Sequence, residues 1–162
     1  MKTSIKNASA RKLNPVEVTI AVTKFNDVLA AGAARGGGGT EYTMKLGKRH
    51  PRALIKGNDI YIKHPGATLR FTIASSGADK QRYYPVGIAF VREGDRISSP
   101  PQRLGHLNFP QSETSVDERT LLVTDSYQDD TRNVRHEFSV VIQRGSDGKI
   151  GIIDPGIVHE ND

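Results

Sequence analysis

Acidic residues gather in one short stretch of the chain, VTDSYQDDTRN, which contains Asp125, Asp129 and Asp130. Carboxylates crowded in a loop are the kind of oxygen ligand that calcium prefers. The stretch lacks the spacing of an EF-hand loop, and it has no glutamate at its end to bind calcium through both oxygens. We therefore interpret it as a solvated acidic turn, with these three aspartates as weak alternative candidates for a metal site.

The histidines are scattered singly, so they form no metal-binding motif by sequence spacing. A metal-dependent or hydrolytic activity assembled in three dimensions from His106, His136 or the acidic turn stays open as a second alternative. Serine is abundant but occurs in no Gly-x-Ser-x-Gly motif, and the chain has no cysteine. That composition excludes thiolate nucleophiles, disulfides and thiolate metal centres. We therefore expect no catalytic residue and no cofactor. The five histidines are His50, His64, His106, His136 and His159.

Basic residues are concentrated in the first half of the chain. Residues 1–70 contain 13 Lys and Arg against 4 Asp and Glu, a balance of +9, and residues 71–162 contain 10 against 14, a balance of −4, which together give +5. Lys48, Arg49 and Arg52 form the tightest cluster, around Pro51. One hypothesis is weak binding of a polyanion or nucleic acid through this cluster. The alternative is a solvated loop, because aromatic residues that could stack on bases are few in this half.

The elements that must position these residues are strands, because apolar residues alternate with a period of two. Val16, Val18, Ile20 and Val22 show the pattern most clearly. Similar short runs follow around Ile60, Leu69–Ile73, Val86–Phe90, Leu121–Val123, Phe138–Ile142 and Ile150–Ile152.

Turn residues separate these runs and favour antiparallel pairing. Gly57-Asn58-Asp59 and Ser146-Asp147-Gly148 each stand between two runs, as in a hairpin. Only residues 25–35 are compatible with a short helix, capped by Asn26 or Asp27. The pattern predicts an all-β protein, a single antiparallel sandwich of seven or eight strands with at most one short helix.

The length of 162 residues fits one domain, which we place at residues 15–162 after a basic N-terminal segment, residues 1–14. The N-terminal residues lack the apolar run of a signal peptide, and no apolar stretch is long enough to span a membrane. We therefore expect a cytoplasmic protein without a membrane partner. We expect the long proline-containing loop at residues 95–115, which carries Arg103, His106 and Phe109, to be exposed and to be where a partner binds.

The last residues of the chain form a recognisable pattern. Proline lacks the N–H that a central strand needs, so Asp154-Pro155 is expected to end the last strand and turn the chain away. Two apolar runs around Asp147-Gly148, followed by DPGI from Asp154 to Ile157, resemble the end of the bacterial DP-EP family. The matching residues include Phe138 to Gln143, but the chain contains no Glu-Pro.

The resemblance implies a bacterial, non-secreted protein with a β-sandwich of the immunoglobulin-like or cupredoxin-like class. It implies no reaction or ligand. Sandwiches with open edges and oppositely charged halves can pair. The leading hypothesis is therefore a non-catalytic interaction module that forms a homo-oligomer and binds a protein partner, with polyanion binding and metal-dependent activity as the two alternatives.

Overall fold

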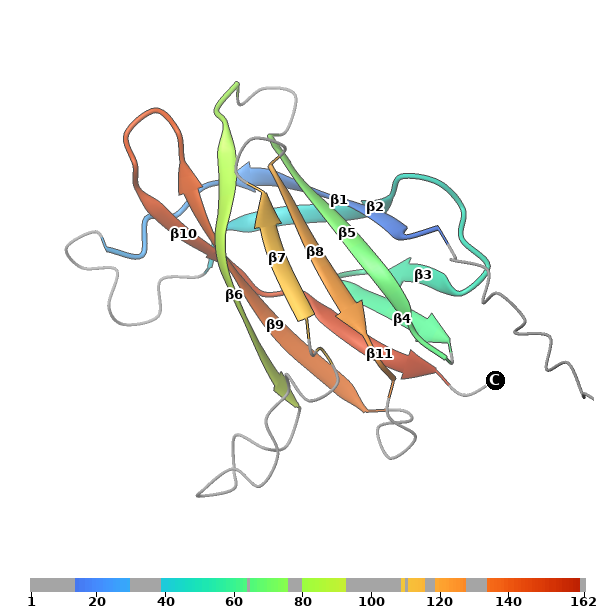
Figure 1. Ribbon diagram of the computed structural model, residues 1–162. Coiled ribbons are helices and arrows are strands. Elements are labelled where there is room, and N and C mark those ends of the chain that lie inside the picture. Colours follow the sequence, from blue (N-terminus) through green and yellow to red (C-terminus); the bar gives the residue numbers. More distant parts are fainter. Residues whose placement is uncertain are drawn as a thin grey trace, which may run out of the picture.

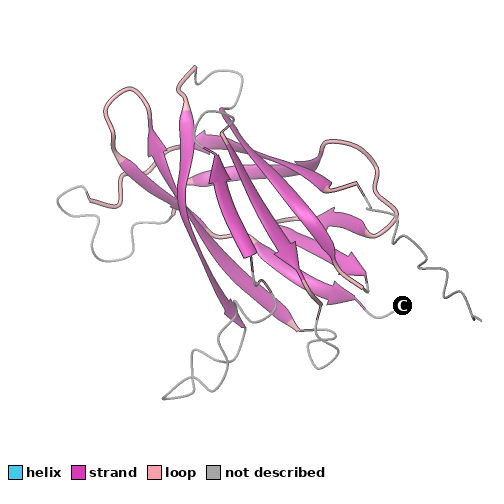
Figure 2. Ribbon diagram, viewed as in Figure 1, coloured by secondary structure: helices cyan, strands magenta, loops and turns pink. Residues whose placement is uncertain are grey.

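A computed structural model describes residues 14–29, 39–63, 65–75, 80–92, 109, 111–115, 119–127 and 134–160. These residues form eleven strands in two sheets and no helix (Figures 1 and 2). Sheet A has the order β2-β1-β5-β8-β7, and sheet B has the order β10-β9-β11-β4-β3, with β6 on the other edge of β9. The strands of sheet A are β1 (Val16–Lys24), β2 (Glu41–Leu46), β5 (Ala67–Ser75), β7 (Gln111–Ser115) and β8 (Thr120–Asp125). Those of sheet B are β3 (Ala53–Lys56), β4 (Asp59–Lys63), β6 (Tyr83–Arg92), β9 (Arg135–Arg144), β10 (Ile150–Ile153) and β11 (Gly156–Glu160).

The predicted all-β sandwich is confirmed, but two details of the prediction are wrong. The structure has more strands than the seven or eight expected, and its sheets are mixed rather than antiparallel. β1 pairs in parallel with β5, and β4 pairs in parallel with β11. Strand β2 of sheet A and strands β3 and β4 of sheet B separate β1 from β5 in the chain. The chain therefore re-enters sheet A beside β1 in the same direction.

The core lies between the two sheets and is built by the alternation seen in the sequence. In β1, the four branched residues of the period-two pattern are buried and the residues between them are partly exposed. Phe71 of sheet A contacts Phe138 of sheet B, with ring centroids 5.3 Å apart. Each such side chain stabilises the fold by roughly 1.5–3 kcal/mol when fully buried. The largest fully buried side chains include Tyr83, Phe71, Phe138, Ile20, Ile60, Ile62, Leu69, Ile73, Leu121 and Ile142.

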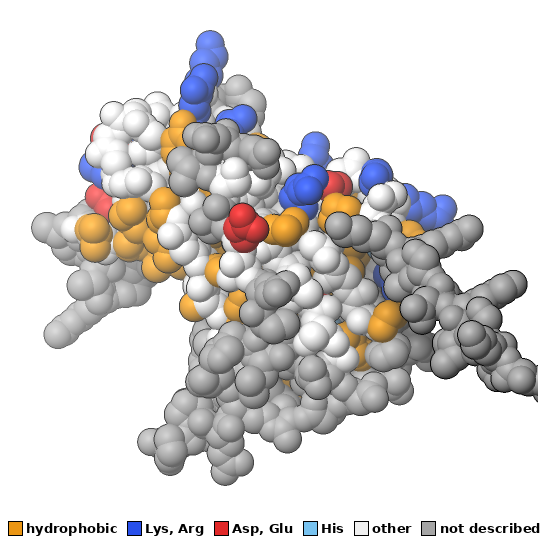
Figure 3. Space-filling model, in the orientation of Figure 1, with side chains coloured by type: hydrophobic (Ala, Val, Ile, Leu, Met, Phe, Trp, Pro, Cys, Tyr) orange, Lys and Arg blue, Asp and Glu red, His pale blue; other side chains and the backbone are white. Residues whose placement is uncertain are grey.

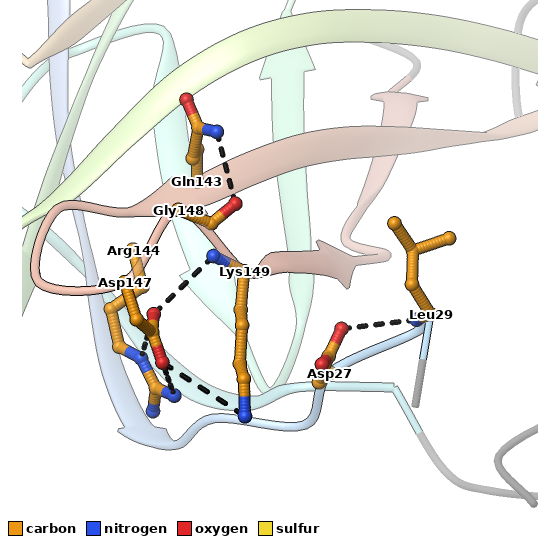
Figure 4. Close-up of polar contacts among 7 residues, drawn as sticks. All are labelled: Asp27, Leu29, Gln143, Arg144, Asp147, Gly148 and Lys149. Carbon is orange, nitrogen blue, oxygen red and sulfur yellow. Dashed lines mark hydrogen bonds and ion pairs between the residues drawn. The ribbon is translucent and has the colours of Figure 1, made fainter. Parts of the chain in front are cut away.

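Both predicted hairpins are present. Gly57 and Asn58 join β3 to β4. Gly148 has a φ of +72°, which favours glycine, and its N–H donates to the carbonyl of Arg144 over 2.8 Å. The carboxylate of Asp147 accepts hydrogen bonds from the guanidinium of Arg144 at 2.9 and 2.6 Å, and from the N–H of Lys149 at 3.3 Å (Figure 4). These bonds hold the turn closed.

Asp154-Pro155 does not turn the chain away. β10 ends at Ile153 as predicted, but the pairing with β9 continues in the same register after the proline: Ile153 lies opposite Val140, and Gly156 lies opposite Glu137. The carbonyl of Pro155 accepts a hydrogen bond from the N–H of Phe138 over 3.0 Å. Proline has no N–H to donate back to β9, so this ladder hydrogen bond is absent at Pro155. β10 and β11 are therefore two parts of one extended segment along β9.

The first residues of the segment predicted as a helix, residues 25–29, are not helical. Residues 25–29 form a turn in which the N–H of Leu29 donates to the Asp27 carboxylate over 3.0 Å, and residues 30–35 lie outside the described residues. The N–H of Val28 donates to the carbonyl of Ile150, and the N–H of Thr40 donates to that of Ile152, both over 2.9 Å. The chain on either side of residues 30–38 therefore covers the outer edge of β10. Within the described part of the chain, no helix is long and apolar enough to cross a membrane.

Candidate functional site

A buried Asp–His pair lies at one end of the sandwich, between β8 and β11. Nε2 of His159 is 2.9 Å from both carboxylate oxygens of Asp125, and both side chains are fully buried. The N–H of Tyr127 also donates to Asp125 over 2.9 Å, and the Tyr127 hydroxyl donates to the carbonyl of Glu160. A carboxylate taken out of water is stable only when hydrogen bonds of this kind satisfy it.

Aromatic rings enclose this pair. Phe109 contacts the rings of His136 and His159 at centroid distances of 5.4 and 6.2 Å, and Tyr127 contacts His159 at 4.3 Å. Gly66 has a φ of +89°, and a Cβ on it would lie 2.3 Å from the carbonyl oxygen of Asp125. A catalytic Asp–His pair needs a nitrogen that a substrate can reach. This one is enclosed, so we assign it a structural role.

The metal candidates are only partly covered by the described residues. Asp125 is engaged by His159, while Asp129, Asp130 and His106 lie outside the described residues. His136 is buried next to His159, with ring centroids 5.3 Å apart. In the described ranges, no group of three or more histidine and acidic residues could hold a metal ion.

Of the three residues expected to bind a partner, Phe109 alone lies among the described residues, and its side chain is buried. Phe109 is 3% exposed and stacks on Phe90 at a centroid distance of 4.3 Å, so the expectation of an exposed Phe109 is wrong. The side chain fills the end of the core between the two sheets. Arg103 and His106 lie outside the described residues, so their part in partner binding stays a prediction.

The basic cluster lies in the turn between β2 and β3. Lys48 and Arg49 are exposed, as expected of a loop around Pro51. Arg52 is half-buried, and its Nη1 is buried without a hydrogen-bond partner. The structure thus separates the cluster into two exposed cations and one that is partly enclosed. Polyanion binding through them stays a prediction.

An open pocket of about 470 Å³ lies where the end of β1 and the start of β2 in sheet A meet sheet B. Sheet B has a notch there, because β4 pairs with β11 only from Asp59 onward and no strand of the described residues pairs with the outer edge of β10. Gly151 lets the chain approach β10 closely, since a Cβ there would lie 2.6 Å from Oγ1 of Thr40. The pocket is lined by Thr23, Gly39, Thr40, Glu41, Tyr42, Asn58 and Asp154.

Tyr42 is the unusual residue of this pocket. Its hydroxyl is buried and has no hydrogen-bond partner. Burial raises the pKa of the Tyr42 phenol, and the carboxylates of Asp154 and Asp59 raise it further. The sequence did not predict this pocket, because the residues that line it come from four separate stretches of the chain. The only sequence signal is Asp154, which was interpreted as part of a strand stop.

A second surface feature is an apolar face on the outer side of sheet B. Val141 of β9 lies opposite Gly87 of β6 on one side and Ile152 of β10 on the other, so these residues share one face of the sheet. Val86 is exposed at a bulge in β6, where the pairing with β9 shifts register. We define the apolar face as Val86, Gly87, Ala89, Val141, Ile150 and Ile152.

Comparison with known proteins adds no relative. No known family, curated protein or solved structure matches the chain. The resemblance of the C-terminal residues to the DP-EP family therefore stays a prediction, and the fold and the surfaces described above are the basis for any function.

Proposed function

We propose that this protein is a non-catalytic β-sandwich interaction module that self-associates through the apolar face of sheet B. The observation that carries the proposal is the position of the two most exposed large hydrophobic side chains among the described residues, Leu29 at 77% and Val86 at 44% exposure. Val86 lies at the β6 edge of the apolar face. Leu29 follows Val28, whose N–H is bonded to Ile150 at the β10 edge.

The apolar face is thus flanked by exposed apolar side chains on both edges. Hydrophobic atoms gather in Figure 3 on the side where Figure 1 places β10 and the segment that ends at residue 29. Between the two edges, Gly87, Val141, Ile150 and Ile152 are partly exposed. A contiguous, partly exposed apolar surface of this kind is typical of protein–protein contacts. It is disfavoured where it meets only water.

The charges around the apolar face support a second copy of the chain as the partner. Lys80 and Arg82 are exposed at the end where β6 begins, and Lys and Arg atoms project there in Figure 3. Asp154 is exposed on the opposite end, where Ser139 donates to it over 2.5 Å on the same face of the sheet. A two-fold axis through Val141 would place the basic end of one copy against the acidic end of the other. Such a contact is self-complementary.

Sedimentation velocity over a wide range of protein concentration tests this proposal. We expect the wild-type chain to form dimers, and the double variant Leu29→Asp/Val86→Asp to weaken dimerisation by at least about tenfold, because burying one valine or leucine contributes roughly 1.5–3 kcal/mol. The matched control is Thr43→Asp, which adds a carboxylate at an exposed position of β2 in sheet A.

Two results would overturn the proposal. The wild-type chain could stay monomeric at every concentration, or the double variant could dimerise as tightly as Thr43→Asp. Circular dichroism of each variant should match that of the wild type, since the substituted side chains lie outside the core. The urea midpoints should match at protein concentrations low enough for all the proteins to be monomeric, because dimerisation itself raises the midpoint.

A further inference from the structure

The pocket between the start of β2 and the notch in sheet B has a lining that differs from the rest of the surface. Seven residues line it, and they include two carboxylates, Glu41 and Asp154, together with hydroxyl and amide groups but no lysine, arginine or histidine. The protein as a whole carries a net charge of +5. An acidic pocket in a basic protein selects for the sign of the ligand charge.

The two carboxylates are held differently. Oδ1 of Asp154 accepts a hydrogen bond from the Ser139 hydroxyl over 2.5 Å, which fixes the side chain. Oδ2 faces Gly39, where a Cβ would lie 3.8 Å away. Glu41 forms a 3.4 Å ion pair with Lys24, in which both side chains are more than half exposed. Exposed ion pairs of this kind are weak, so Glu41 can exchange Lys24 for a ligand cation.

The Arg135 guanidinium offsets the carboxylates near the pocket only in part. Arg135 is bound to Asp59 and to Glu137 at 2.9 Å each, so two carboxylates already share its charge. Burial is the largest cause of the raised pKa of the Tyr42 phenol, the carboxylates of Asp154 and Asp59 raise it further, and Arg135 lowers it by less than either carboxylate raises it. The Tyr42 hydroxyl therefore stays neutral at physiological pH. These features indicate a negative potential at the wall that Tyr42 provides.

We propose that this pocket binds a small organic cation through a primary ammonium group. An ammonium is a compact charge with three hydrogen-bond donors, and the lining offers the carboxylates of Asp154 and Glu41 and the amide oxygen of Asn58 as acceptors. A metal ion fits the lining less well, because no metal-binding group of three or more histidine and acidic residues occurs among the described residues. An anion would be repelled. Asp154 also belongs to the proposed contact between two copies, whereas Glu41 belongs to the pocket alone.

The test is a titration with three four-carbon compounds of different charge, observed by ¹H–¹⁵N NMR at low salt. The probes are 1,4-diaminobutane, butane-1,4-diol and succinate. We expect only the diamine to shift the amide signals of residues 39–42, 58 and 154, with a dissociation constant on the order of millimolar, as two partly solvated charge contacts provide.

Two variants and a control make the test specific. Asp154→Asn and Glu41→Gln keep the shape of the lining but remove one charge each, and each should weaken diamine binding by about fivefold, which corresponds to about 1 kcal/mol. Glu113→Gln makes the same chemical change at an exposed position of β7 and should leave binding unchanged. Diamine binding that salt reduces and that Glu113→Gln leaves intact would support the proposal.

Three outcomes would overturn it: equal binding of the diol, unchanged affinity in both pocket variants, or no shift in the pocket signals. Glu41 belongs to the pocket and not to the apolar face, so Glu41→Gln should leave sedimentation of the protein unchanged. Failure of ligand binding can therefore be distinguished from failure of self-association.

Discussion

At the scale of single residues, the Asp125–His159 pair shows how burial decides what a titratable side chain does. Both residues could take part in acid–base or metal chemistry. Their side chains are fully buried and contact each other at 2.9 Å, surrounded by Phe109, Tyr127 and His136. The pair connects β8 of sheet A to β11 of sheet B, so its role is to join the two sheets.

Replacing His159 should therefore destabilise the fold. His159→Ala leaves the Asp125 carboxylate buried without its main partner, and we expect a loss of about 3 kcal/mol in the free energy of unfolding, measured by urea denaturation. The double variant Asp125→Asn/His159→Ala should lose less than the sum of the two single variants, because no unpaired charge remains. Additive losses would show that the two side chains do not interact.

Asp147 gives a prediction for the pH dependence of stability. The hydrogen bonds from the Arg144 guanidinium lower the pKa of Asp147 from its ordinary 3.8 to about 2. Because this pKa is lower in the folded state, the contribution of Asp147 is complete above about pH 4 and is lost as the pH falls toward 2. We expect Asp147→Asn to be less stable than the wild type at pH 7, and the difference to shrink between pH 4 and pH 2. A difference that stayed constant over this range would contradict the assignment.

At the scale of elements, Asp154-Pro155 shows that a proline can interrupt a strand without ending its pairing with the neighbouring strand. Proline removes one N–H from the ladder, but it can still accept through its carbonyl, as the bond from Phe138 shows. On the outer side of the segment, no strand among the described residues pairs with β10, while β11 pairs with β4. The proline lies at the change from an edge strand to an interior strand, and the chain passes through it without losing register.

Pro155→Ala should therefore preserve the fold. We expect a change in the free energy of unfolding of no more than about 1–2 kcal/mol. Loss of the proline ring removes packing and increases the entropy of the unfolded chain, and both effects destabilise the fold. The new N–H can form a ladder hydrogen bond that offsets them. Hydrogen exchange should show protection of the new amide at position 155, opposite Phe138. A fast-exchanging amide, or a chain that no longer folds, would show that the proline sets the chain direction after all.

At the scale of the whole molecule, the distribution of charge matters more than the net charge. The basic first half places Lys48 and Arg49 in the turn after β2, while the acidic pocket also begins in β2, at Glu41. The distribution of charge along the chain therefore does not predict its distribution over the surface, because each sheet contains strands from both halves of the chain.

The proposed self-association should depend on salt concentration. Lys80 and Arg82 would meet Asp154 of a second copy, and these side chains are exposed in the monomer. Exposed charges are screened over about 8 Å at physiological ionic strength. The dissociation constant measured by sedimentation should therefore rise with sodium chloride, whereas an association driven only by the apolar face would become tighter or stay the same.

Local patterns predicted the elements well. Alternation at Val16–Val22 and at Phe138–Ile142 predicted strands and their buried faces, and Asp147-Gly148 predicted a hairpin, because side-chain direction and turn geometry depend on neighbouring residues. The same reasoning failed at Phe109, where a proline-containing loop indicated exposure but the side chain fills the end of the core.

The sequence by itself determined that this protein is an all-β sandwich without cysteine chemistry, since composition and period are properties of the chain alone. Only the tertiary structure decided that β1 pairs with β5, that Asp125 contacts His159 across 34 positions, and that Tyr42 and Asp154 share one pocket. Pairing between distant strands depends on how the whole chain packs. No local pattern encodes it, and for that reason both proposed binding surfaces become visible only in the folded molecule.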